Sequence, residues 1–130
     1  MAGKRVLVVD DEIHIVHVVA IKLRNNGYEV MSADNGAEAF ELACREKPDV
    51  VVTDFQMPIM TGLELVEKLR QHEKTKDTPV IMLTARNFAV SKKHRERLQI
   101  SSCLSKPFSP KELLENIEDI LYQKELMTDS

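Results

Sequence analysis

The stretch VLVVDDE, residues 6–12, decides the fold of this chain. Four consecutive apolar residues, three of them β-branched, are followed at once by three acidic residues. A short run with no alternating polar face is typical of a strand buried on both faces, as in a parallel sheet. Similar runs occupy residues 28–33, 50–53 and 80–83, and a weaker one occupies residues 102–105. We therefore predict five strands, the first of which ends at a cluster of carboxylates.

Helical patterns separate these runs and follow the last of them. The predicted helices cover residues 13–25, 36–45, 61–72 and 87–99, and a last one begins at Ser109-Pro110 and frays over residues 127–130. Asn26-Gly27 is a stop signal for the first helix, and Thr61 is a suitable N-cap for the third. Residues 87–99 carry the weakest helical pattern because most of them are polar or basic. Five alternating strands and helices predict an α/β fold, a doubly wound (βα)5 unit of the flavodoxin-like type with a parallel sheet of order 2-1-3-4-5.

The composition is that of a compact intracellular domain. The chain has 130 residues, of which 43% are hydrophobic and 30% charged, and its net charge is −3. This length predicts a single domain, residues 1–130, with no effector domain beside it. The negative charge argues against direct nucleic acid binding, and no apolar run is long enough to cross a membrane. Residues 1–5 lead directly into the first apolar run without the cleavage pattern of a signal peptide. Two cysteines are too few for a disulfide framework, which favours a cytoplasmic location.

Polar residues stand at the predicted carboxyl ends of four strands. The first strand is followed by Asp10 and Asp11, the third by Asp54, the fourth by Thr84 and the fifth by Lys106. In the order 2-1-3-4-5 these four strands are neighbours, so all five residues should meet at one edge of the sheet. Three carboxylates at such short range repel one another unless a cation lies between them. Oxygen ligands suit a hard divalent ion, which predicts a Mg²⁺ site with Lys106 as a further positive charge.

This set of residues favours phosphoryl transfer onto an aspartate. A carboxylate beside Mg²⁺ can act as a nucleophile toward phosphorus when its surroundings neutralise the phosphoryl oxygens. Lys106 would contribute a positive charge to those oxygens, and the hydroxyl of Thr84 would donate a hydrogen bond to one of them.

Four motifs in order resemble one known family. They are VVDDE at residues 8–12, DFQMPIMTG at residues 54–62, LTA at residues 83–85 and KPF at residues 106–108. Together they resemble the receiver domain of two-component response regulators, the CheY-like domain, over residues 4–126. The resemblance implies that Asp54 accepts a phosphoryl group from a histidine kinase or a histidine phosphotransfer protein, and that the phosphorylated chain signals through a downstream protein partner. It implies no turnover of an external substrate, only phosphorylation and dephosphorylation of the chain itself.

The resemblance also assigns roles at the site. Asp11 and Asp54 are implied to bind Mg²⁺ directly, together with the backbone carbonyl of Gln56, and Asp10 to act largely through water. Thr84 and Lys106 are implied to contact the phosphoryl group. A cis peptide bond is implied between Lys106 and Pro107.

Three positions are expected to tune the switch. Receivers usually carry Tyr or Phe three residues before the lysine, whereas this chain has Cys103, so switching by an aromatic ring is in doubt. Gln56 and Arg86 stand two residues after the acceptor and two after the threonine, where they flank the path of the attacking water. Arg86 either contacts the phosphoryl oxygens and slows hydrolysis or points into solvent.

Two surface features remain open. The first helix is apolar nearly all round, so Ile13, Val18 and Ile21 are either scattered surface residues or a docking surface for the helices of a phosphodonor. Residues 86–97 contain five Lys or Arg and one Glu, which is either a solvated helix face or a site for an acidic partner.

Other functions are compatible with parts of this pattern. A flavodoxin shares the topology, but the acidic residues 10–12 would repel a flavin phosphate. A small phosphatase with an aspartate nucleophile, of the haloacid dehalogenase type, would carry Asp-x-Asp after the first strand, where this chain has Glu12 at the third position. The alternative outside catalysis is an interaction module that acts without phosphorylation, which only Cys103 and the unusual fourth helix favour.

Overall fold

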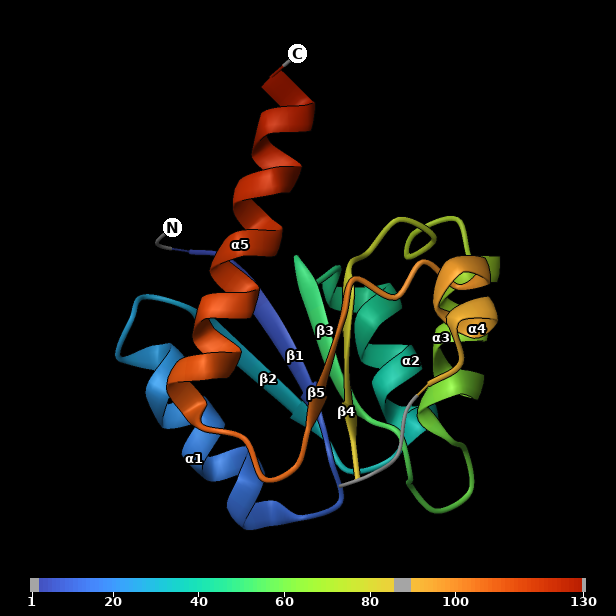
Figure 1. Cartoon of the computed structure of the whole chain (residues 1–130), viewed down its shortest axis with the longest axis horizontal. Helices are drawn as coiled ribbons and strands as arrows, with labels where there is room; N and C mark the ends of the chain where they lie inside the picture. Colours follow the sequence, from blue (N-terminus) through green and yellow to red (C-terminus); the bar gives the residue numbers. More distant parts are fainter. Residues whose placement is uncertain (1–2, 86–89, 130) are drawn as a thin grey trace.

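The computed structural model describes residues 3–85 and 90–129, which form a five-stranded parallel sheet flanked by helices on both faces (Figure 1). The sheet has the predicted order β2-β1-β3-β4-β5. Its strands are β1 (Arg5–Val9), β2 (Glu29–Ala33), β3 (Val50–Asp54), β4 (Val80–Thr84) and β5 (Ser102–Ser105). The helices are α1 (Ile13–Arg24), α2 (Gly36–Glu46), α3 (Gly62–Gln71), α4 (Lys92–Arg97) and α5 (Pro110–Asp129). The predicted fold is thus confirmed.

The core is divided into two layers by the sheet. Helices α1 and α5 cover one face, and α2, α3 and α4 cover the other (Figure 1). Successive residues of a strand point to opposite faces, so Val6 and Val8 pack with α1 and α5 while Leu7 and Val9 pack with α2 and α3. This double burial explains why β1 has no polar position within its apolar run.

Local capping groups fix several helix boundaries. Thr61 and Glu64 form a capping box at the start of α3, and Asn35 accepts a hydrogen bond from the backbone N–H of Glu38 at the start of α2. Two boundary predictions were wrong. The described part of the predicted helix 87–99 is helical only from Lys92 to Arg97, after an N-cap at Ser91, and residues 87–89 lie outside the described chain. At the other end, α5 continues to Asp129, whereas fraying was predicted from Met127.

Helix α4 is attached to the body mainly by polar contacts. None of its six residues is buried. The guanidinium of Arg70, on α3, donates hydrogen bonds to the carbonyls of Leu98 at 2.8 Å and Gln99 at 3.3 Å, just after α4. Arg97 also forms a 3.1 Å ion pair with Glu67 of α3. Apolar support comes from Val90, Leu98 and Ile100, which flank the helix and join the core beside α3.

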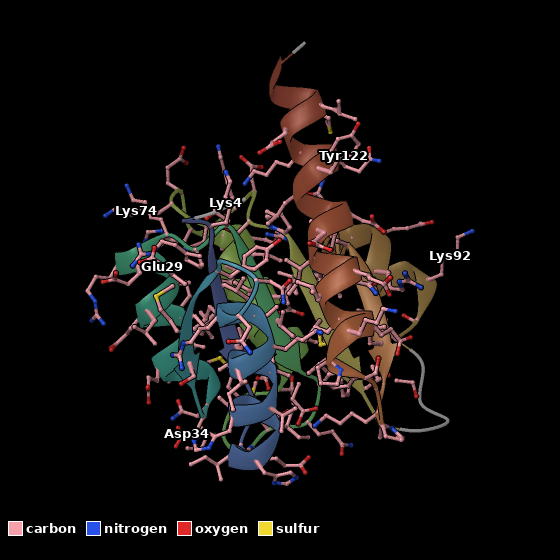
Figure 2. All side chains as sticks on the ribbon, turned by 90° about the vertical axis from the view of Figure 1, so that its left-hand side faces the viewer. Lys4, Glu29, Asp34, Lys74, Lys92 and Tyr122 are labelled. Carbon is pink, nitrogen blue, oxygen red and sulfur yellow. The ribbon has the colours of Figure 1, made fainter. Side chains whose placement is uncertain are left out.

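Helix α5 runs from the carboxyl edge of the sheet to a point beyond the opposite edge (Figure 1). Tyr122 lies on this projecting part, as Figure 2 shows, and it is exposed together with Leu126 and Met127. Neither α5 nor any other helix in the described ranges combines the length and the apolar character needed to span a bilayer.

Candidate functional site

The site lies at the carboxyl edge of the sheet, the lower edge in Figure 1. Asp10 directly follows β1, Asp54 ends β3, Thr84 ends β4 and Lys106 directly follows β5. The parallel registers align these ends, since Val9 pairs with Thr53, Asp54 with Leu83 and Thr84 with Ser105. The convergence of Asp10, Asp54, Thr84 and Lys106 therefore follows from strand order and register.

Lys106 is the centre of the charge cluster. Its Nζ donates hydrogen bonds to Oδ2 of Asp10 at 2.9 Å and to Oε1 of Glu12 at 3.0 Å, and it lies 3.4 Å from Oδ2 of Asp54. Burial alone would lower the pKa of Lys106, but the hydrogen bonds to Asp10 and Glu12 and the charges of Asp10 and Asp54 outweigh it and raise the pKa. Lys106 is therefore held as a cation among three carboxylates.

Asp54 is buried at the base of the cluster, with 7% of its surface exposed. Burial raises the pKa of its carboxyl, the negative charge of Asp10 raises it further, and Lys106 only partly opposes these two effects. The metal-free site thus leaves the Asp54 carboxylate with an excess of negative charge around it. An additional cation would relieve this repulsion.

The loop after Asp54 passes close to the strand end. A Cβ atom on Gly62 would overlap the backbone oxygen of Asp54, so only glycine allows α3 to begin this close to β3. The Gly62 N–H donates to the carbonyl of Phe55 at 2.8 Å, which closes the loop. Within it, Ile59 has φ +74° and is 91% exposed, a backbone region that a β-branched side chain rarely adopts.

Thr84 is near the cluster without joining its ion pairs. Its hydroxyl is buried and donates to the carbonyl of Leu104 at 3.4 Å, a long and weak hydrogen bond. The peptide bond between Lys106 and Pro107 is cis, as the resemblance implied.

The other predicted site residues lie in different surroundings. The side chains of Asp11 and Gln56 are exposed, and Asp11 is outside the close group of carboxylates although its charge still reaches Asp54. Cys103 is half-buried as a free thiol packed against the core beside α3. Burial raises its pKa, an effect that the charge of Arg95 partly opposes. Arg86 lies outside the described residues, so its role stays a prediction.

Glu12 belongs to the site, although the sequence reasoning gave it no role. Oxygens of Asp10, Glu12 and Asp54 lie within 4.8 Å of one another. Glu12 was visible as the third acidic residue after β1, but the turn of its carboxylate toward Lys106 depends on a residue 94 positions away. Its backbone N–H donates to Oδ1 of Asp10 at 2.9 Å, which fixes the turn between β1 and α1.

The cluster of three carboxylates, Asp10, Glu12 and Asp54, suits a hard divalent cation. Its donors are oxygens from Asp10, Glu12 and Asp54, of which Asp10 and Asp54 are buried and Glu12 is partly exposed. Mg²⁺ prefers oxygen ligands, keeps several waters and commonly binds one or two carboxylates together with a phosphate. The donor set therefore fits Mg²⁺.

Comparison with known proteins agrees with this geometry. Residues 6–118 match the family model described as the response regulator receiver domain. The phosphate regulon transcriptional regulatory protein PhoB of Pseudomonas aeruginosa is 36% identical over 121 residues, 93% of this chain and 53% of that protein. The alkaline phosphatase synthesis transcriptional regulatory protein PhoP of Bacillus subtilis is 37% identical over 128 residues, 98% of this chain and 52% of that protein. The chain thus spans about half the length of these relatives.

Solved structures show the same architecture. The chemotaxis response regulator CheY4 of Vibrio cholerae has a TM-score of 0.84 and 36% identity, covering 92% of this chain and 99% of its own. The receiver domain of the sensor histidine kinase PA1611 from Pseudomonas aeruginosa has a TM-score of 0.77 and 28% identity, covering 88% and 93%, and is described with a magnesium ion coordinated in its active site cleft. Because the family model covers residues 6–118 and the sheet has the same architecture as these solved structures, the chain belongs to the receiver domain family of two-component response regulators.

Proposed function

We propose that Asp54 is the phosphoacceptor of this receiver domain and that Mg²⁺ is its cofactor. The observation that carries this proposal is the position of Asp54 at the end of β3, 3.4 Å from the Lys106 ammonium and within the carboxylate group. The raised pKa of Asp54 supports the proposal. Burial and the charge of Asp10 destabilise the ionised carboxylate, and a bound cation would stabilise it. The proposed ligands are Asp10, Asp11, Asp54 and the backbone carbonyl of Gln56. Glu12 is not one of them, because its exposed carboxylate is paired with Lys106.

The proposed chemistry is phosphoryl transfer from a phosphohistidine. An oxygen of the Asp54 carboxylate attacks phosphorus, the P–N bond to the imidazole breaks, and the leaving nitrogen takes a proton. Mg²⁺, when bound, neutralises charge on the phosphoryl oxygens. Lys106 supplies a second positive charge there, and the weakly bonded hydroxyl of Thr84 is free to turn toward the same oxygens. Water later attacks phosphorus, releasing inorganic phosphate and restoring the Asp54 carboxylate, so the chain turns over only its own phosphoaspartate.

The proposed phosphodonor is a histidine kinase or a histidine phosphotransfer protein that docks on α1. Ile13, Val18 and Ile21 are exposed on this helix, and Val18 lines a cavity of about 550 Å³ that also contains Lys106 and Phe108. An apolar surface this close to the acceptor suits the apolar face of a partner helix. We therefore expect Val18→Ser with Ile21→Ser to slow transfer from a protein donor and to leave labelling by a small phosphodonor unchanged.

The proposed output is contact with a downstream protein. The net charge of −3 makes direct DNA binding by residues 1–130 unfavourable, although relatives such as PhoB are named transcriptional regulators. We treat residues 1–130 as one receiver domain. Cys44 and Cys103 are free thiols, which agrees with a reducing compartment such as the cytoplasm.

Intact-mass spectrometry tests the acceptor assignment. Wild type incubated with a small phosphodonor and Mg²⁺ should gain the mass of one phosphoryl group in an acid-stable, base-labile adduct. Asp54→Asn should gain none, whereas Asp77→Asn, an exposed aspartate before β4, should label like wild type. Equal labelling of Asp54→Asn would refute the assignment, and loss of labelling when Mg²⁺ is chelated would support the cofactor.

A further inference from the structure

Lys106 divides its contacts unequally among the three carboxylates. The two short contacts, 2.9 Å and 3.0 Å, go to Asp10 and Glu12, and the contact to the acceptor Asp54 is longer at 3.4 Å. An ammonium group has three N–H donors, and here two of them are committed to residues other than the acceptor. Lys106 therefore lies closer to Asp10 and Glu12 than to Asp54, the proposed acceptor.

Asp10 and Glu12 hold the lysine in different ways. Asp10 has a fully buried side chain that also accepts the backbone N–H of Glu12, so it is part of the turn after β1. The Glu12 side chain is 46% exposed and caps no helix N–H, although its residue is the N-cap of α1. Among the described residues the Glu12 carboxylate makes polar contact only with Lys106 and, at 3.7 Å, with His14. Glu12 is thus the partner that can be removed without dismantling the turn.

From this arrangement we propose that Glu12 is a positioning residue that restrains Lys106 and competes with the phosphoryl group for it. The inference rests on the proposed function, since it assumes that phosphate arrives at Asp54. A phosphoryl group brings nearly two negative charges and three strong acceptor oxygens. Because Asp10 and Glu12 take two of the three N–H donors of Lys106, the ammonium can turn more than one donor toward these oxygens only by releasing a partner, and the exposed contact to Glu12 is the one that costs least to break. The Glu12 charge also repels the incoming phosphate, so both effects slow phosphorylation.

Two substitutions separate the contact from the charge. Glu12→Gln keeps the length of the side chain and removes its charge. Glu12→Asp keeps the charge and shortens the side chain by one methylene, which withdraws it from Lys106. Glu41→Gln, at an exposed position on α2, is the matched control for a change in net charge alone.

The first measurement is the rate of labelling with a small phosphodonor at saturating Mg²⁺. We expect Glu12→Gln to label about fivefold faster than wild type, which corresponds to about 1 kcal/mol of barrier. Glu12→Asp should label about twofold faster, and Glu41→Gln should match wild type. Wild-type rates in Glu12→Asp would show that Glu12 acts by repulsion alone, and slower labelling in either variant would show that it assists Lys106; both results overturn the proposal.

The second measurement needs neither metal nor phosphate. The rate at which acetic anhydride acylates Lys106 is measured by peptide mass spectrometry. A slow rate indicates that the amine is engaged by its carboxylate partners. Acylation should be faster in both Glu12 variants, while the reactivity of Lys92, exposed on α4 (Figure 2), should stay constant as an internal reference. Unchanged reactivity of Lys106 would overturn the restraint. If wild type fails to label at Asp54, the proposed function fails; if it labels and the Glu12 variants behave as wild type, only the present inference does.

Discussion

Two regions of the molecule differ in how deeply their side chains are buried. One consists of strands β1 and β3, and the other is the segment from α4 to β5. The apolar residues of β1 and β3 from Val6 to Val9 and from Val50 to Val52 have no exposed surface. In β5 only Leu104 is buried, and α4 has no buried residue at all. The first region is held by side chains packed on both faces of the sheet. In the second, β5 is held mainly by backbone pairing with β4, and α4 by Arg70, the Glu67–Arg97 ion pair and a few flanking apolar residues.

The site residues at the carboxyl edge come from both regions. Asp10 and Asp54, which would bind metal and phosphate, stand at the ends of the tightly packed strands. Lys106 stands at the end of β5, a strand that pairs with β4 alone and has one buried residue. Packing fixes the positions of Asp10 and Asp54, while the polar contacts around α4 can be exchanged at low cost, so we expect motion on the proposed phosphorylation to concentrate there.

Truncation of core residues should give the largest effects and is the strongest test of the contrast. Leu7→Ala in β1 should lower the free energy of unfolding by about 4 kcal/mol, because Leu7 is fully buried and the sheet cannot close around the cavity. Ile100→Ala, just before β5, should cost about 2 kcal/mol, since its surroundings relax more easily. Urea denaturation measures both values. Equal losses would mean that the two regions are packed alike.

Removal of the Arg70 guanidinium should have an intermediate and local effect. Arg70→Met keeps the aliphatic length but removes the donor to the carbonyls of Leu98 and Gln99, and also to those of Thr75 and Lys76, at a cost of about 2 kcal/mol. Backbone amides of residues 98–104 should exchange with deuterium faster than in wild type, and those of β1 should not. Lys68→Met, on the same helix, is the matched control, because Lys68 lies over the ring of Phe40 and away from α4. Uniformly faster amide exchange throughout the sheet would show that the effect of Arg70 is not confined to the segment after α4.

The sequence predicted the packed region better than the segment from α4 to β5. Runs such as residues 6–9 identify a strand by composition alone, and strand order then brings Asp10, Asp54, Thr84 and Lys106 to one edge. The direction of the Glu12 carboxylate and the partners of Arg70 depend on side-chain rotamers and on residues up to 94 positions away, which no local pattern encodes. The limits of α4 were missed because a helix without a buried face has no apolar periodicity to mark it.

The pH dependence of Asp54 gives a smaller effect, confined to the packed region. Because its pKa is raised in the folded protein, the ionised carboxylate destabilises the metal-free fold at about pH 7, and protonation removes this penalty. Asp54→Asn should therefore be more stable than wild type at neutral pH. The difference should shrink as the pH falls through the raised pKa and vanish below about 3.9, the unfolded value, where both forms are neutral. Urea denaturation in chelator across this range measures it, and a less stable Asp54→Asn at neutral pH would contradict the charge imbalance.

The smallest effect is expected from the strained loop that follows Asp54. Ile59→Gly should raise the free energy of unfolding by about 1 kcal/mol, since glycine adopts φ +74° without steric cost and Ile59 buries almost nothing. Ile13→Gly is the contrasting variant: Ile13 is also exposed but helical, so glycine there should destabilise. A loss of stability in Ile59→Gly would show that the side chain makes contacts that outweigh the strain.

Helix α5 connects the edge of the sheet that carries the site to the opposite edge. Its first turn follows Lys106 after only three intervening residues, and its twenty residues make a rod of about 30 Å. A rod of that length pivoting by about 4° about its first turn moves its last turn by about 2 Å. Because the projecting turns lie beyond the sheet, that displacement meets no opposing strand. Helix α5 thus connects the edge that carries Lys106, through the buried Leu113, Ile117 and Leu121, to the exposed Tyr122, Leu126 and Met127 beyond the opposite edge.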